Sequence, residues 1–137
     1  MGKILSVDYG TKRTGIAITD AMQLIATGLT TVATHSLNEF LSDIMIKEDI
    51  ECIVVGLPKN LDGTQTDVTR YVNNFIKRLE RIYPAIIIKQ VDERFTSKIA
   101  KDTILTSGVN KKRRQDKFLV DQVSATIILQ SYLACRE

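Results

Sequence analysis

The sequence predicts an α/β fold, a five-stranded mixed sheet flanked by helices, formed as a single domain by residues 1–137. Two patterns lead to this prediction. The chain begins with three short segments rich in β-branched and apolar residues, which is typical of antiparallel strands joined by turns. Further on, short apolar runs alternate with amphipathic segments, as in strands connected by crossover helices. A chain of 137 residues has the usual size of one domain.

The first three strands are expected close together in the sequence. They are predicted at residues 3–8, 14–19 and 24–32. The first strand ends on an acidic residue, Asp8, and a turn begins at Tyr9. A second turn is expected over residues 20–23. Gly15 lies inside the second strand, where a glycine marks the close approach of another backbone.

Helices and strands alternate in the rest of the chain. Ser36 is predicted to cap a helix whose apolar stripe continues to Met45. The next strand, 51–57, is largely apolar, as in a strand buried on both faces of a parallel sheet. The remaining elements are expected as a helix from Thr64 or Thr66 to about 81, a strand at 85–91, a helix from Thr96 or Ser97 to about 106, and a last helix over about 116–134.

Composition argues against several classes of protein. No run of eighteen apolar residues is present and the first ten residues lack the features of a signal peptide, so we expect a cytoplasmic protein without a membrane partner. Cys52 and Cys135 lack metal-ligand spacing and are expected to be free thiols. The single histidine, His35, has no partners at ligand spacing, which argues against a zinc site or a serine triad.

Two aspartates are candidates for chemistry. Asp8 ends a strand at the edge where α/β sheets bind ligands, although an aspartate before a glycine is also typical of an ordinary turn. Asp121 lies on the helix face that carries Ser124, Ala125 and Ile128. A carboxylate there is costly to bury unless a cation or hydrogen-bond donors compensate it. The alternative is that Asp121 only favours the helix dipole.

A further acidic pair, Asp92 and Glu93, follows the strand at 85–91. Side chains alternate across a strand, so the two carboxylates should point to opposite faces and at most one can share a site with Asp8. The alternation groups Glu93 with Val91, but it leaves open which face carries the site. A solvent-exposed ion pair with Arg94 is the other interpretation.

The net charge of +3 is too small to identify a partner, but its distribution is informative. The four consecutive basic residues are Lys111, Lys112, Arg113 and Arg114. They precede the helix that carries Asp121. Such a run is often a solvated loop, yet beside a cluster of carboxylates it suits binding to a phosphate backbone. The loop after residue 57, with its threonines, could either bind a phosphate or only connect two elements.

Four separated motifs carry a resemblance to a known family. They are DYGTKRTGIAI, VVGLPKNLDGT, VDERFTS and VDQVSATIILQSYL, in this order. With them the chain closely resembles the YqgF/RuvX family of pre-16S ribosomal RNA nucleases over essentially its whole length. The resemblance implies an RNase H-like fold, akin to the RuvC Holliday-junction resolvases.

The family's acidic residues fall on Asp8, Glu93 and Asp121, so the resemblance favours Glu93 over Asp92. It implies that these three residues hold Mg²⁺, or Mn²⁺, for phosphodiester hydrolysis. Magnesium is a hard cation that prefers oxygen ligands, and one or two ions could activate water and stabilise the leaving oxygen. The groups expected to contact substrate phosphates are Lys12, Arg94 and Lys111, Lys112, Arg113 and Arg114.

Precursor 16S ribosomal RNA is the expected substrate, and branched DNA is the alternative. Two other classes remain open. One is an actin-like or Hsp70-like ATPase, although those enzymes need two lobes and this length allows one. The other is a non-catalytic RNA-binding factor of ribosome assembly, whose acidic residues would be vestigial. The chain is expected to act as a monomer or a homodimer.

If the basic run binds phosphates, replacing Lys112→Glu and Arg113→Glu together should weaken binding to nucleic acid at low salt. Each lost contact removes counterion release, so the slope of log K against log salt should fall by about 0.7 per contact for single strands. Binding titrations at several salt concentrations measure this slope. An unchanged slope would mean that the run is a solvated loop.

Overall fold

The computed structural model describes residues 2–57, 68–92 and 117–135, with the side chains of 117–120 left aside. The elements in these ranges are β1 (Lys3–Asp8), β2 (Arg13–Thr19), β3 (Ala26–Ala33), a 3-10 turn η1 (Thr34–Ser36), α1 (Leu37–Lys47), β4 (Ile50–Leu57), α2 (Thr69–Ile82), β5 (Ile87–Asp92) and α5 (Lys117–Cys135). The strands form one sheet in the order β3-β2-β1-β4-β5. β1, β2 and β3 pair antiparallel, whereas β4 and β5 run parallel to β1. The predicted five-stranded mixed sheet is confirmed.

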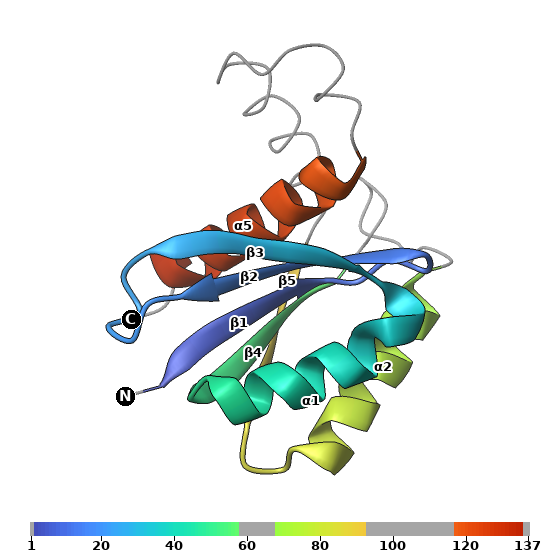
Figure 1. Cartoon of the computed structure of the whole chain (residues 1–137), viewed down its shortest axis with the longest axis horizontal. Coiled ribbons are helices and arrows are strands. Elements are labelled where there is room, and N and C mark those ends of the chain that lie inside the picture. The colour runs from blue at the N-terminus through green and yellow to red at the C-terminus, as the bar shows by residue number, and fades with distance from the viewer. Residues whose placement is uncertain (1, 58–67, 93–116, 136–137) are drawn as a thin grey trace.

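Helices cover both faces of this sheet. Figure 1 shows α1 and α2 on one face and α5 on the other. Leu5 and Val7 of β1 pack into the core under α1 and α2, whereas Ile4 belongs to the core under α5. β4 alternates in the same way, because neighbouring side chains on a strand point to opposite faces. This alternation assigns each strand residue near the sheet edge to one of the two faces.

α5 lies very close to the sheet where it crosses β2. A Cβ atom on Gly15 would overlap the carbonyl oxygen of Asp121, so only glycine fits there. Nearby, the buried Ser6 hydroxyl donates a hydrogen bond of 2.8 Å to the carbonyl of Ala125. Ser124 and Ala125 are both buried, and their small size lets the helix approach. The predicted close backbone approach at Gly15 is confirmed.

The turn between β2 and β3 is longer than predicted, which moves the start of β3 from residue 24 to Ala26. The Asp20 carboxylate accepts hydrogen bonds from the backbone N–H groups of Met22, Leu24 and Ile25. These bonds, from Ile25 first and then Leu24, lower the pKa of Asp20. Gln23 adopts a positive φ of 58°, and its buried side chain donates to the carbonyl of Gly2. The loop therefore has a defined structure of its own.

Ser36 occupies the N-cap position of α1, as predicted, but its side chain does not cap the helix. Thr34–Ser36 form a 3-10 turn, so Ser36 has φ −101° and ψ 3° instead of the extended backbone that a capping side chain needs. Its hydroxyl makes no capping hydrogen bond. α2 is described from Thr69, β5 begins at Ile87, and α5 agrees with the prediction within about a residue. The predicted helix caps at positions 64 and 66, and the predicted helix over about 96–106, lie outside the described residues.

Two glycines under α5 provide a test of this packing. Gly15→Ala should destabilise the protein by about 2–3 kcal/mol, because the new methyl group would meet a backbone carbonyl. Gly28→Ala is the control. There the new methyl group would meet the side chain of Gln122, at 2.7 Å from its Nε2 atom, and this side chain can move, so about 1 kcal/mol is expected. Denaturant unfolding measures both free energies, and equal losses would contradict the proposed role of the close approach.

Candidate active site

Asp8 ends β1 on the face of the sheet that α5 covers. It continues the alternation of Ile4 and Ser6, both of which lie under α5. In the antiparallel pairing of β1 with β2, Asp8 lies directly opposite Gly15. Cross-strand partners place their side-chain positions on the same face, about 5 Å apart between Cα atoms. The Asp8 carboxylate therefore lies beside the position where Gly15 meets α5.

Asp121 reaches the same place from the helix. Its carbonyl is the group that Gly15 approaches, and its side chain is only 28% exposed. Gly15 is thus the common neighbour of the two aspartates, one across the β1–β2 ladder and one across the contact with α5. The fold therefore brings two acidic residues that are far apart in the sequence to the same glycine, at the end of β1.

A cation not predicted from the sequence belongs to this site. The Nε atom of Arg13 donates to Oδ2 of Asp121 at 3.2 Å. Arg13 begins β2, and alternation along that strand places it on the same face as Gly15 and Ala17. This alternation was the available signal. It identifies the face of Arg13, but the partner on α5 becomes visible only in the structure.

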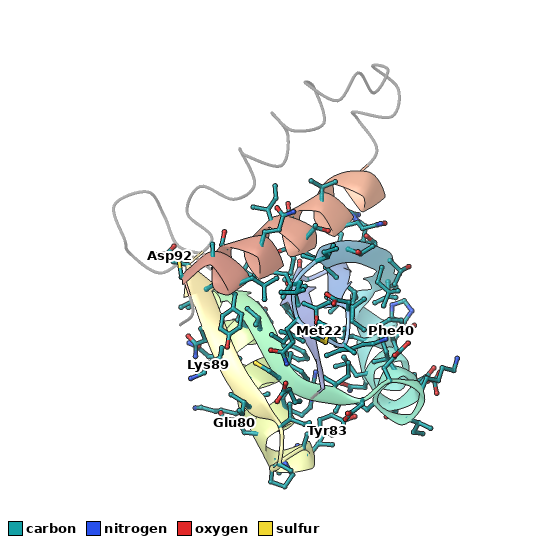
Figure 2. All side chains as sticks on the ribbon, turned by 90° about the vertical axis from the view of Figure 1, so that its left-hand side faces the viewer. Met22, Phe40, Glu80, Tyr83, Lys89 and Asp92 are labelled. Atoms are coloured by element: carbon teal, nitrogen blue, oxygen red, sulfur yellow. The ribbon has the colours of Figure 1, made fainter. Side chains whose placement is uncertain are left out.

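The register of β5 assigns Asp92, the last described residue of this strand, to one face of the sheet. Asp92 pairs with Leu57 of the parallel strand β4, and Leu57 packs on the side of α1 and α2. Val91, in contrast, packs against the core under α5. Asp92 therefore belongs to the face opposite Asp8 and Asp121. Figure 2 shows Asp92 at the end of β5, with Lys89 further back along the same strand.

Of the remaining predicted site residues, Lys12 lies in the described part of the chain. Lys12 is exposed in the turn between β1 and β2, next to Arg13. Two hydrogen bonds from Thr34 hold that turn in place. The backbone N–H of Thr34 donates to the backbone carbonyl of Lys12 at 2.9 Å, and the Thr34 hydroxyl donates to the carbonyl of Gly10 at 2.6 Å. The predicted residues that lie outside the described ranges are Glu93, Arg94, Lys111, Lys112, Arg113 and Arg114.

The chemistry of the site suits a hard divalent cation. Within residues 2–57, 68–92 and 117–135, no three Asp, Glu, His or Cys side chains form a group that could hold a metal. Asp8 and Asp121 supply two carboxylates, and the third expected ligand, Glu93, is not among these residues. The carboxylate of Asp121 already draws one cation, the guanidinium of Arg13. Negatively charged carboxylate oxygens are ligands that Mg²⁺ prefers.

Comparison with known proteins relates the whole chain to one group. A family model described as RuvX, Holliday junction resolvase, matches residues 2–135. A protein of Flavobacterium johnsoniae named "Putative pre-16S rRNA nuclease" is 50% identical over 136 residues, which is 99% of each chain. A protein of Porphyromonas gingivalis with the same name is also 50% identical, over 97% of this chain and 96% of its own length.

Solved structures show the same fold. The structure of Thermus thermophilus RuvC in complex with a Holliday junction substrate matches with a TM-score of 0.59 over 98% of this chain and 95% of that chain. A second RuvC structure from the same organism gives a TM-score of 0.51. Sequence identities are 12% and 11%, so these matches speak for the fold alone. The expected RNase H-like fold is confirmed.

Proposed function

This chain belongs to the RuvX family, and from that membership we propose that it is a metal-dependent nuclease that hydrolyses phosphodiester bonds. The observation that carries the proposal is the convergence of Asp8, Asp121 and Arg13 around Gly15 at one end of the sheet. Two acidic groups at a sheet edge, with basic residues beside them, suit a cation and a phosphate bound together. The relatives match over nearly their full length, so we assign the activity to residues 1–137 as one domain.

The residues proposed to hold the cation are Asp8, Glu93 and Asp121, with Mg²⁺ as the expected ion and Mn²⁺ as an alternative. When bound, the metal would lower the pKa of a water molecule and stabilise the charge on the leaving oxygen. Glu93 is preferred to Asp92 because neighbouring residues of a strand point to opposite faces and Asp92 belongs to the face of α1 and α2. The fold-level contribution of the protein is to bring carboxylates from distant parts of the chain to one point.

The basic residues are proposed to bind the phosphates that flank the scissile bond. Lys12 lies in the turn that joins Asp8 to Arg13. A nucleic-acid strand that passes the two aspartates would therefore also pass this turn. Lys111, Lys112, Arg113 and Arg114, together with Arg94, are proposed to extend the contact along the backbone. Such contacts position a nucleic acid without reading its sequence.

The proposed substrate is precursor 16S ribosomal RNA, because this is the molecule in the name of the relatives at 50% identity. Four-way DNA junctions are the second candidate, favoured by the description of the matching family model. Processing of precursor ribosomal RNA would place the protein in the cytoplasm, as a monomer or a homodimer. No helix in the described part of the chain is long and apolar enough to span a membrane.

Replacing Asp121→Asn or Asp8→Asn should reduce cleavage by more than about a hundredfold, because loss of a direct metal ligand should exceed the roughly 10–100-fold typical of groups that only orient ligands. The fold should survive. In Asp121→Asn the ion pair with Arg13 is lost, but repulsion from Asp8 is relieved. Cleavage of precursor ribosomal RNA and of a four-way junction, each with Mg²⁺, Mn²⁺ or a chelator, measures the effect and identifies the substrate.

Asp92→Asn is the matched control for these variants. It removes the same charge at the same edge of the sheet, but from the opposite face, so most of the activity should remain. Thermal unfolding of all three variants separates lost catalysis from lost structure. Full activity in Asp121→Asn would refute the assignment of the site, and equal losses in Asp92→Asn and Asp121→Asn would show that the assignment of faces is wrong.

A further inference from the structure

The ion pair between Arg13 and Asp121 joins two elements that are 108 positions apart in the sequence. The Nε atom of Arg13 lies 3.2 Å from Oδ2 of Asp121. The two side chains are 29% and 28% exposed, so neither is sealed in the core. Water and small ions can reach such a pair. The contact can therefore be exchanged without unfolding any element.

Both ends of this ion pair are held by the fold. On the side of β2, the main chain of Arg13 pairs with Ala33, and the hydroxyl groups of Thr14 and Thr34 share a hydrogen bond of 2.9 Å. On the side of α5, the backbone of Asp121 rests against Gly15, only two residues after Arg13. The guanidinium group is thus directed to Asp121 by two fixed segments of backbone. An ordinary surface ion pair lacks such support and contributes little.

The same carboxylate cannot serve two cations equally well. We propose that Arg13 is the internal counterion of Asp121: it neutralises this carboxylate when no divalent cation is bound, competes with that cation for it, and turns to a phosphate of the nucleic acid once the cation has taken its place. This inference rests on the proposed function, since it assumes that Asp121 binds a metal. Arg13 would in this way link the metal to the substrate.

The chemistry of the two partners supports this exchange. Asp8 lies opposite Gly15 in the strand ladder and the backbone of Asp121 lies against the same glycine, so two negative charges belong to one small region that a cation stabilises. A divalent cation that takes the place of the guanidinium brings two positive charges to Asp121 instead of one. The released guanidinium has five donors in a planar arrangement that fits phosphate oxygens. Arg13 is therefore a positioning residue before the metal binds and a phosphate ligand afterwards.

The proposal predicts effects of opposite sign on two affinities. Arg13→Gln should bind Mn²⁺ more tightly than the natural protein, by up to about fivefold, because the ion no longer has to displace a competing cation. The same variant should bind nucleic acid more weakly in the presence of Mn²⁺. A purely structural role for Arg13 would weaken both kinds of binding together.

Calorimetric titration of the full chain with Mn²⁺, in the absence of nucleic acid, measures the first affinity. Lys12→Gln is the matched control, because it removes the same charge at the neighbouring position without removing the ion pair, and its affinity for Mn²⁺ should stay close to that of the natural protein. Arg13→Lys, which retains a cation, should restore most of the natural value. Asp121→Asn should weaken Mn²⁺ binding and so show that the titration reports on this site.

The second affinity is measured by fluorescence anisotropy with a single-stranded RNA oligonucleotide that has phosphorothioate linkages, which resist hydrolysis. Adding Mn²⁺ should tighten binding to the natural protein, and Arg13→Gln should lose that increase. The inference is overturned if Arg13→Gln binds Mn²⁺ as weakly as the natural protein or more weakly, or if Asp121→Asn leaves Mn²⁺ binding unchanged. Metal binding as expected, but with no cleavage of any nucleic acid, would refute the nuclease and leave the role of Arg13 standing.

Discussion

The contact of Gly15 with the backbone of Asp121 sets the position of α5 on the sheet, and the candidate site depends on it. A side chain at position 15 would push the helix away by roughly the width of a methyl group. Asp121 would then move away from Asp8, which lies opposite Gly15 in the strand ladder. Interiors are packed too closely to absorb such a shift elsewhere. A residue without a side chain thus determines the distance between two charged ones.

The small residues that surround this contact serve the same purpose. Ser6 presents a hydroxyl to the carbonyl of Ala125, and Ser124 and Ala125 present short side chains to the sheet. Beyond them, Ile128 and Leu129 fill the core between α5, β1 and β4. Large apolar groups supply the burial that holds α5 on the sheet, while small polar and apolar groups near its start let its backbone approach the acidic edge. One part of the helix thus stabilises its packing on the sheet, and another part sets how closely its backbone approaches the sheet.

Most of the fold follows from local sequence patterns, and the structure confirms the five strands and the helices that it describes. Asp8, Gly15 and Asp121 were identified because each departs from the pattern of its element: a charge at the end of a buried strand, a glycine inside a strand and a charge on an apolar helix face. Ser36 was correctly placed at the N-cap of α1, but its side chain makes no capping hydrogen bond because a 3-10 turn precedes the helix and sets its backbone angles. Arg13 was missed because its partner is distant in the sequence.

The choice between Asp92 and Glu93 depends on the face of the sheet to which each belongs, and sequence patterns do not predict this face. Alternation along a strand separates the two residues, but only the pairing of β5 with β4 shows which face Asp92 belongs to. Register depends on how the strands align in the folded sheet. The resemblance to a family chose Glu93 on other grounds, and the position of Asp92 agrees with that choice.

α5, the last described element in the sequence, packs on β1 and β2, which come first. A ribosome builds the chain from its N-terminus, so the hairpin that carries Asp8 and Arg13 is complete long before Asp121 is added. Until then, the face of the sheet that α5 will cover, with Ile4, Ala17 and Val54, is not yet buried by that helix. A nascent chain therefore lacks one wall of its own acidic site.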